Sequence, residues 1–489
     1  MSPIKNYCLK IFRELSTHKV KFSLYLLASF LSMNILWMFR EFGYPTAEQI
    51  IYHIQNGPEG LNGIDQAFIR SYVKNVLIAI FLYAAIFTIL DVRFLKSNWI
   101  KHLRGFSKTL SRLGPLYLFI IVVFFEVYQS RLYEYLKPLP SEDFIEKSYV
   151  NPKELSFTRD KQKNLILIYV ESLEKNYLDP SLFKTDPLRP LETLPGYTID
   201  RFIQAPGISY TMAGIVSSQC GLPLKVMIAA TKNRQGLLMN HFLPNALCMG
   251  DVLKQQGYEN VFLGGASLLF AGKGKFFSGH GYDKTMGREE WMDTGRYKKE
   301  DMNYWGLYDE DLFIEAKKEL KRLKNLGKPF NLTILTINMH NPKGFLSPSC
   351  KAQGGKNFED IVGCSARSVA NFVSDIQYEG YLRDTNVVIL GDHLTMPNDV
   401  YKQLRQHGEG HIYNKWITED AFNPKHHEIV HFDIAPTVLD FIGVRIKEGR
   451  FGMGYSVLSD TANTIEANRM ETIKKHLLQR SEFYYTFWK

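Results

Sequence analysis

Side chains suited to metal binding and acid–base chemistry stand directly after short apolar segments. Glu171 follows one such segment, His340 follows another, and the pair Asp392-His393 follows a third. Carboxylate oxygens and imidazole nitrogens are the ligands that suit divalent ions such as manganese and zinc. A single acid in this position can equally cap a helix. Three segment ends that carry Glu, His and Asp-His together favour one shared site.

Such residues need a scaffold that brings distant segments together. Short apolar runs bounded by polar residues have the pattern of buried parallel strands, and they occupy 164–170, 260–263, 332–337 and 386–390. The amphipathic stretch 312–323 is typical of a helix between strands. Strands that alternate with helices predict an α/β domain with a mostly parallel sheet. In such sheets, sites form beyond the carboxyl ends of the strands.

Composition points to a membrane rather than to nucleic acid. The 489 residues are 45% hydrophobic and carry a net charge of +9, which is too long a chain for one ordinary domain. Apolar runs crowd the first 130 residues, and much of the positive excess flanks them. That arrangement is typical of a membrane protein. No nucleic-acid-binding motif accompanies the charge, so we expect no nucleic-acid partner.

Three apolar segments predict membrane-spanning helices, each near the ~20 residues that a crossing needs: 22–39, 76–90 and 113–128. The second and third are short, so a buried core helix is the alternative for either. Lys and Arg gather before the first segment and between the second and third. This bias predicts a cytoplasmic N-terminus and an extracytoplasmic location for everything after about residue 130. No small-residue cleavage site follows the first segment, so we do not expect a cleaved signal peptide.

The predicted organisation therefore has five parts. They are a cytoplasmic leader (1–21), a membrane domain of about three helices (22–135), a proline-containing linker (136–160), an extracytoplasmic α/β domain (161–460) and a tail (461–489). The tail ends in the aromatic run 483–488. Such a run either packs onto the domain or lies at the membrane interface, where Trp and Tyr are favoured.

Four of the five cysteines lie in the predicted extracytoplasmic domain, and an even number fits an oxidising compartment. Four cysteines allow three pairings. We favour Cys220–Cys248 with Cys350–Cys364, because each pair closes a short loop. Free buried thiols are the alternative. A thiolate metal site is disfavoured, since no Cys-x-x-Cys pair exists.

Several segments together resemble a known family. They are the run from Asn164 to Glu174, the run from Pro206 to Pro223, Trp305-Gly-Leu-Tyr-Asp309 and His431-Phe-Asp-Ile-Ala-Pro-Thr437. Their order and spacing resemble the alkaline-phosphatase-like superfamily, in the branch of lipoteichoic acid synthases and periplasmic-glucan phosphoglycerol transferases. The resemblance covers roughly residues 160 to 445. The loop 45–53 and the four extracytoplasmic cysteines are also similar to features of that branch.

The resemblance implies a role for particular residues. The implied ligands of one divalent metal ion, manganese before zinc or magnesium, are Glu171, Thr211, Asp392 and His393. Thr211 would be the nucleophile, because metal coordination lowers the pKa of its hydroxyl; the alternative is a helix-capping threonine. His340 would contact the substrate phosphate and could protonate the leaving group. Lys273 stands near the place of a phosphate-binding arginine of lipoteichoic acid synthases.

Other polar residues have plainer interpretations. Glu174 is expected to be a solvated or first-turn helix residue. The histidines expected to be structural or surface groups are His407, His411, His426 and His427. The first two of these could still reach an acceptor.

The function that the resemblance implies is phosphoglycerol transfer. Phosphatidylglycerol in the lipid bilayer would be the donor, diacylglycerol the by-product and an extracytoplasmic glycan the acceptor, with a bacterial inner-membrane location. The alternatives are a phosphoethanolamine transferase acting on lipid A or a glycan, and a non-catalytic membrane scaffold. A sulfatase activity is disfavoured, because Cys220 is followed by Gly-Leu-Pro-Leu and not by the x-Pro-x-Arg that a modified cysteine needs.

Overall fold

The computed structural model describes residues 18–42, 45–55, 72–96, 104–137, 139–160, 162–225, 241–446, 448–460 and 469–489. The chain divides into two compact units. The helical unit comprises Met1–Ala47 and Ile64–Lys137, and the α/β unit comprises Glu48–Gly63 and Pro138–Lys489. Each is described separately below.

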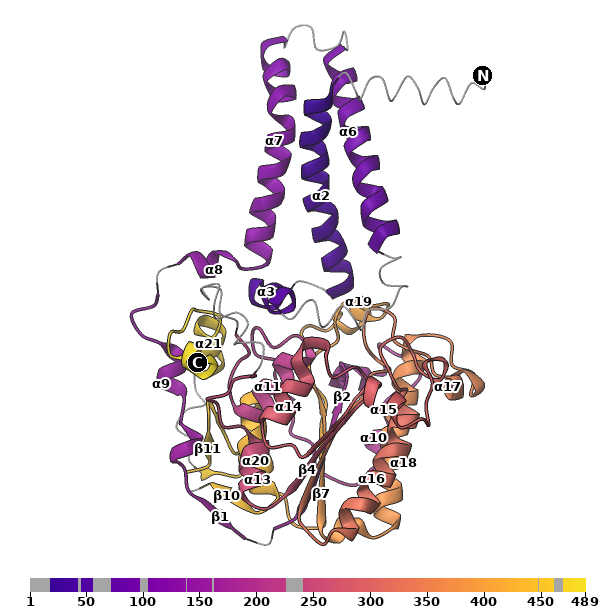
Figure 1. Cartoon of the computed structure of the whole chain (residues 1–489), viewed down its shortest axis with the longest axis vertical. Coiled ribbons are helices and arrows are strands. Elements are labelled where there is room, and N and C mark those ends of the chain that lie inside the picture. The colour runs from indigo at the N-terminus through magenta and orange to yellow at the C-terminus, as the bar shows by residue number, and fades with distance from the viewer. Residues whose placement is uncertain are drawn as a thin grey trace. The chain divides into compact units, whose positions relative to one another are not determined.

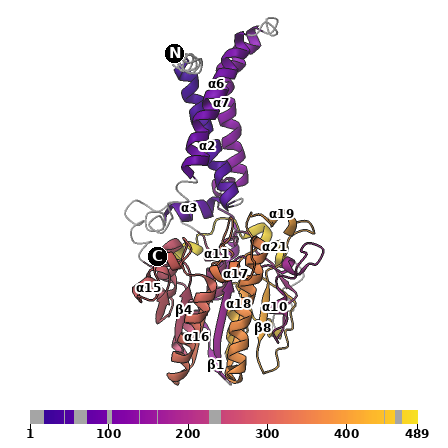
Figure 2. The same cartoon turned by 90° about the vertical axis from the view of Figure 1, so that its right-hand side faces the viewer.

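The helical unit is built from three long helices, in which α2 contacts both α6 and α7 (Figures 1 and 2). Their bounds are α2 Lys19–Phe42, α6 Ile78–Lys96 and α7 Arg104–Gln129. Two segments, Lys19–Arg40 and Val73–Asp91, are long and apolar enough to cross a membrane. Their apolar windows are only 17% and 22% buried, unlike those of core helices. The third apolar segment, Leu116–Gln129, is helical but shorter.

A six-stranded sheet forms the centre of the α/β unit, with the order β5-β4-β6-β2-β7-β8. The strands are β2 Asn164–Val170, β4 Glu259–Gly264, β5 Lys284–Met286, β6 Phe330–Leu335, β7 Thr385–Gly391 and β8 Asn414–Ile417. All neighbours pair in parallel except β7 and β8. The four strands and the mostly parallel sheet predicted from sequence are confirmed, and β2 lies at the centre.

Helices cover both faces of this sheet, as Figure 1 shows. Side chains alternate along β2: Leu165 and Leu167 join one apolar core, whereas Ile166 and Ile168 join the other. The first core is closed by α11 Thr211–Cys220, α13 Met249–Gln255, α14 Lys273–Gly279 and α20 Ile434–Phe441. The second is closed by α10 Arg189–Glu192, α16 Asp309–Asn325 and α18 Phe358–Tyr378. Strands buried on both faces explain the continuous apolar runs in the sequence.

Shorter elements join these layers. They are the strand pairs β3 Arg201–Phe202 with β9 Glu428–Ile429 and β11 Arg450–Phe451 with β12 Gly454–Tyr455, and the helices α15 Arg288–Asp293, α17 Pro348–Ala352 and α19 Tyr401–Leu404.

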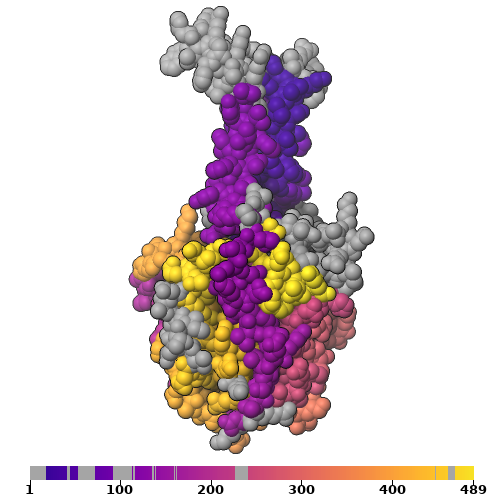
Figure 3. All heavy atoms as spheres, turned by 90° about the vertical axis from the view of Figure 1, so that its left-hand side faces the viewer, coloured from indigo at the N-terminus to yellow at the C-terminus, as the bar shows by residue number. Residues whose placement is uncertain are grey.

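The segment predicted to be a linker is folded onto the α/β unit. It contains α9 Phe144–Ser148 and β1 Phe157–Arg159, and β1 pairs antiparallel with β10 Val444–Ile446 near the other end of the chain. In Figure 3 this purple segment runs over the surface beside the yellow C-terminal residues. Asp143 accounts for part of this order, because one carboxylate oxygen caps α9 and the other accepts the Ser481 hydroxyl at 2.8 Å.

The C-terminal residues also pack onto the α/β unit. Helix α21 Arg469–His476 buries Ile473, and the last turn, Tyr484–Trp488, buries Tyr484 and Phe487. Of the two interpretations of the aromatic tail, packing onto the domain is the one that the structure shows.

Helix α3, Ala47–Gln55, meets these C-terminal residues at a buried lysine. Glu48 forms a buried ion pair with Lys225 at 3.0 Å. The Lys225 backbone accepts the Trp488 indole N–H and donates to the Tyr484 hydroxyl oxygen. Two segments far apart in the sequence are thereby joined through one residue.

Candidate active site

Three strand ends meet at one edge of the sheet. Glu171 directly follows β2, Asp392 and His393 follow its parallel neighbour β7, and His340 follows β6 on the other side of β2. Parallel pairing in register therefore places these ends together, as sheets of this type require. Helix α11 contributes its first residue, Thr211.

Glu171, Asp392 and His393 form a compact buried cluster. One possible ligand atom from each lies within 4.8 Å of the other two. His393 Nε2 is 3.3 Å from Glu171 Oε1 and 3.6 Å from Asp392 Oδ2. All three residues are almost wholly removed from solvent. Two carboxylates and one imidazole at such distances have the composition of a divalent metal site.

The hydrogen bonds around the cluster leave atoms available for an ion. Asp392 Oδ1 accepts the backbone N–H groups of Ser172 and His393, while Asp392 Oδ2 is buried and has no hydrogen-bond partner among the described residues. The Leu394 carbonyl lies 2.8 Å from His393 Nδ1, so this nitrogen carries the proton in the neutral ring. That leaves the Nε2 lone pair of His393 for a metal, the arrangement expected of a histidine ligand. The residues present therefore fit a divalent ion.

The three buried side chains of the cluster shift one another's pKa values. Burial, reinforced by the charge of Glu171, raises the pKa of Asp392 to about 7. Burial also opposes ionisation of Glu171, but the hydrogen bond from His393 and nearby positive charge lower its pKa to about 2. Burial alone would lower the pKa of His393, but the negative charges of Asp392 and Glu171 have the larger combined effect and raise that pKa to about 9. The two carboxylates therefore favour positive charge in this cluster, which a divalent cation would supply.

Thr211 lies beside this cluster because α11 approaches β7 closely. Its hydroxyl donates to Glu171 Oε2 at 3.3 Å. One turn further on, a Cβ at Gly214 would stand 2.2 Å from the Asp392 carbonyl oxygen, so only glycine permits this approach. The hydroxyl also sits at the N-terminus of a ten-residue helix, where the helix dipole favours negative charge. The predicted nucleophile and the predicted ligands are therefore brought together.

His340 and Lys273 complete the group of predicted residues. His340 Nδ1 lies 2.9 Å from the Asn341 carbonyl, and burial lowers the pKa of the ring. Lys273 is buried at the start of α14, with Nζ 5.1 Å from the centre of the Phe270 ring. Burial lowers the Lys273 pKa to about 8, against the opposing charges of Glu171, Glu289 and Asp392. The sequence alone gave no signal that Lys273 would be buried.

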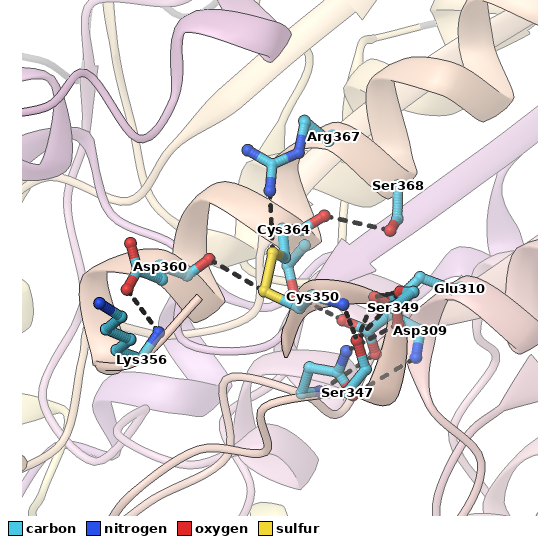
Figure 4. Close-up of a disulfide and its surroundings, with 12 residues drawn as sticks. Asp309, Glu310, Ser347, Ser349, Cys350, Lys356, Asp360, Cys364, Arg367 and Ser368 are labelled. Carbon is cyan, nitrogen blue, oxygen red and sulfur yellow. Dashed lines mark hydrogen bonds between the residues drawn. A yellow bond between two sulfur atoms is a disulfide. The ribbon is translucent and has the colours of Figure 1, made fainter. Parts of the chain in front are cut away.

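Buried hydrogen bonds hold the loop that carries His340. Asp309, the first residue of α16, accepts the backbone N–H groups of Ile337 and Asn338 at 2.7 and 3.1 Å. Its other oxygen accepts the Ser365 hydroxyl at 2.6 Å. Ser365 follows Cys364, which is bonded to Cys350 (Figure 4). This disulfide thus ties α17 and α18 to the loop of His340, and the other favoured pair, Cys220–Cys248, is also present.

Glu174 is where the sequence interpretation was wrong. It is neither solvated nor in a helix: it is completely buried and makes a two-pronged ion pair with Arg405. Its partner lies 231 residues away in the sequence, which is why periodicity gave no indication.

The four histidines that were expected to be structural or surface groups behave differently from one another. His407 and His427 are exposed, and His411 is partly buried. His426, in contrast, is buried, and its Nε2 lies 3.1 Å from the Ser459 carbonyl oxygen.

A second group of ligand-type residues does not form a metal site. Cys248 is in a disulfide, and His280 is held at both ring nitrogens, by Asp251 and by the Phe242 carbonyl, each at 2.9 Å.

A parallel sheet with a Glu, Asp and His cluster beside a helix-terminal threonine defines the alkaline-phosphatase-like fold class. The sequence profile described as Sulfatase matches residues 163–444, more than half of the chain. The chain belongs to the sulfatase family.

Named relatives add detail. The chain is 34% identical over 310 residues to phosphoglycerol transferase I of Citrobacter koseri, and 34% identical over 315 residues to that of Escherichia coli O6:K15:H31. Each match covers 61% of this chain but only 39% of the relative's length.

Solved structures show similar folds at lower identity. The lipoteichoic acid synthase of Listeria monocytogenes is 18% identical, covering 64% of this chain and 81% of that chain, with a TM-score of 0.49. A protein of the alkaline phosphatase superfamily from Vibrio parahaemolyticus is 22% identical, covering 64% and 77%, with a TM-score of 0.47.

Proposed function

We propose that this protein is a metal-dependent phosphoglycerol transferase. It moves glycerol phosphate from phosphatidylglycerol to an extracytoplasmic glycan and releases diacylglycerol. The observation that carries the proposal is the position of Thr211, whose hydroxyl lies 3.3 Å from Glu171 within the Glu171, Asp392 and His393 cluster. The relatives named phosphoglycerol transferase I support this choice of headgroup.

The proposed reaction has two displacements. In the first, Thr211 Oγ1 bonds to phosphorus, the bond from phosphorus to the diacylglycerol oxygen breaks, and a phosphodiester forms on the threonine. Thr211 loses its hydroxyl proton in this step and the departing oxygen gains one, so the two balance, with His340 as the proposed donor to the departing oxygen. In the second, a hydroxyl of the acceptor replaces Thr211 at phosphorus, and the threonine recovers its proton.

The residues have separate tasks in this scheme. Glu171, Asp392, His393 and Thr211 would hold one divalent ion, with manganese as the proposed metal. Such an ion would lower the pKa of the threonine hydroxyl and neutralise phosphoryl oxygens. Lys273 and His340 would bind the phosphate, and the buried position of Lys273 strengthens that attraction because water screens it poorly.

The helical unit suits a donor that resides in a bilayer. Two of its segments are long and apolar enough to cross a membrane. We propose three crossings in a bacterial inner membrane, with the α/β unit on the extracytoplasmic side, because Lys and Arg gather before α2 and between α6 and α7.

The test uses the purified full-length chain with manganese and phosphatidylglycerol, beside Thr211→Ala. Mass spectrometry should find a glycerol-phosphate adduct on Thr211, and diacylglycerol should be released by the wild type alone. Thr211→Ser, which keeps a hydroxyl, should retain part of the activity. Full activity of a folded Thr211→Ala protein would contradict the proposal, and an ethanolamine-phosphate adduct formed from phosphatidylethanolamine would assign a different headgroup.

A further inference from the structure

A tryptophan beside the candidate active site carries a buried hydrogen-bond donor that none of the described residues accepts. Trp305 is 9% exposed, and its indole Nε1 has no hydrogen-bond partner among the residues that the structure describes. Leaving such a donor unpaired costs about 1–3 kcal/mol, so native proteins seldom tolerate one without a reason. The unpaired indole N–H therefore points to a ligand.

The position of the ring identifies that ligand's site. The Trp305 ring lies 4.5 Å from the ring of His340 and 4.7 Å from that of Phe270, measured between centroids. Phe270 in turn lies under Lys273 Nζ. The indole thus lies beside His340 and is linked to Lys273 through the Phe270 ring, and His340 and Lys273 are the residues proposed to bind the phosphate.

The backbone on either side of Trp305 is fixed by hydrogen bonds and close packing. The Asn303 side-chain oxygen accepts the backbone N–H groups of Trp305 and Gly306 at 2.8 and 3.0 Å. Leu307 N–H bonds to the Gly265 carbonyl. A Cβ at Gly306 would lie 1.9 Å from the same Gly265 oxygen, so the two backbones pack without room for a side chain. A donor fixed in this way can discriminate between ligands.

We propose that Trp305 Nε1–H donates to a hydroxyl oxygen of the transferred headgroup and thereby selects a polyol phosphate over an ethanolamine phosphate. The inference rests on the proposed function. An indole N–H can only donate, and an ammonium group can only donate as well, so an ethanolamine headgroup would leave the indole unsatisfied. A glycerol hydroxyl can accept. The buried cation of Lys273 beside Phe270 further disfavours a second positive charge.

The experiment compares three donor lipids in detergent micelles with the full-length chain and manganese. They are phosphatidylglycerol, phosphatidylethanolamine and phosphatidylpropanol, which lacks both headgroup hydroxyls. Diacylglycerol release gives kcat/KM for each. The wild type should prefer phosphatidylglycerol over phosphatidylpropanol by about tenfold or more, because losing the acceptor leaves a buried donor unpaired.

Trp305→Phe removes the N–H and keeps an aromatic ring. It should lower kcat/KM for phosphatidylglycerol about tenfold and leave phosphatidylpropanol nearly unchanged, so that the preference falls to within about twofold. Trp291→Phe is the matched control, because Trp291 is also buried but its indole already donates to the Gly264 carbonyl at 2.9 Å. It should lower stability and keep the preference.

The outcomes separate the two proposals. If the wild type uses phosphatidylglycerol and phosphatidylpropanol equally well, the proposed role of Trp305 is wrong, whatever the variants show. The proposed transferase function would be unaffected. A Trp305→Phe protein that keeps the full preference would also show that this role is wrong. A wild type that releases diacylglycerol from none of the three lipids overturns both.

Discussion

The Arg405 guanidinium donates two hydrogen bonds, of 2.6 and 2.8 Å, to the Glu174 carboxylate, which is completely buried. Glu174 lies three residues after Glu171, and its Oε2 also accepts the Thr395 backbone N–H, two residues beyond His393. The ion pair therefore joins the segments that follow β2 and β7, which together carry the candidate metal ligands.

Glu174→Gln should destabilise the protein by about 3 kcal/mol, because it leaves the largely buried Arg405 without its counter-charge. In thermal unfolding, Tm should fall by roughly 4 °C, as expected for a unit of this size. Glu142→Gln is the control: Glu142 pairs with Lys147, but both side chains are more than half exposed, so Tm should change little. Equal Tm values for the two variants would mean that burial of the Glu174 pair has no energetic consequence.

Metal removal should abolish transfer. A chelator is expected to strip the ion, and inductively coupled plasma mass spectrometry of the untreated protein should find about one divalent ion per chain. Asp392→Asn should lower that content strongly, because it removes a charge from a buried site. Asp251→Asn should not, since Asp251 belongs to the ligand-type group that disulfide and hydrogen bonds already satisfy. Equal metal content in both variants would exclude the Glu171, Asp392 and His393 site.

Asp309 should make stability depend on pH. Burial raises its pKa to about 7, above the unfolded value near 3.8, so the folded state holds the proton more tightly. The folded state then binds more protons than the unfolded state between about pH 4 and pH 7, and this group's contribution falls as pH rises through that range. Tm of the wild type should therefore decline toward pH 8 more than that of Asp309→Asn, whose amide can still accept from Ile337 and Asn338 and donate to Ser365. Parallel Tm profiles would show that Asp309 does not titrate in this range.

The disulfide in Figure 4 should contribute about 3 kcal/mol, the loop-closure value for its 14-residue separation. Replacing both Cys350 and Cys364 by serine should lower Tm correspondingly. This variant keeps the Cys220–Cys248 disulfide, so any further fall in Tm on adding a reducing agent should come from reduction of that bond. A variant as stable as the wild type would show that the hydrogen bonds of Asp309 and Ser365 hold this region without the bond.

Much of the fold follows from local patterns. The runs that became β2 and β7 are continuously apolar because both faces of the sheet are covered, and a polar residue ends each. The structure then brings Glu171, Asp392 and His393 together as the order of the motifs implied. What the sequence could not supply was pairing across long separations. Glu174 finds Arg405 231 residues later, and the segment after residue 138 folds with β10.

The ion pair of Glu48 and Lys225 has a consequence for how this protein is assembled and dissected. By contacts, the α/β unit is one body whose chain is interrupted by residues 64–137 of the helical unit, as in a domain insertion. Glu48 can form this ion pair only after Lys225, 177 residues further along the chain, has been synthesised. A fragment that begins at residue 138 would lack α3. The buried Lys225 ammonium would then have lost its partner Glu48. The fragment would also lack the Tyr52 hydroxyl, which donates to the Ala271 carbonyl two residues before Lys273. Such a fragment lacks part of the α/β unit, so activity lost on truncation would not by itself show that the helical unit takes part in the chemistry.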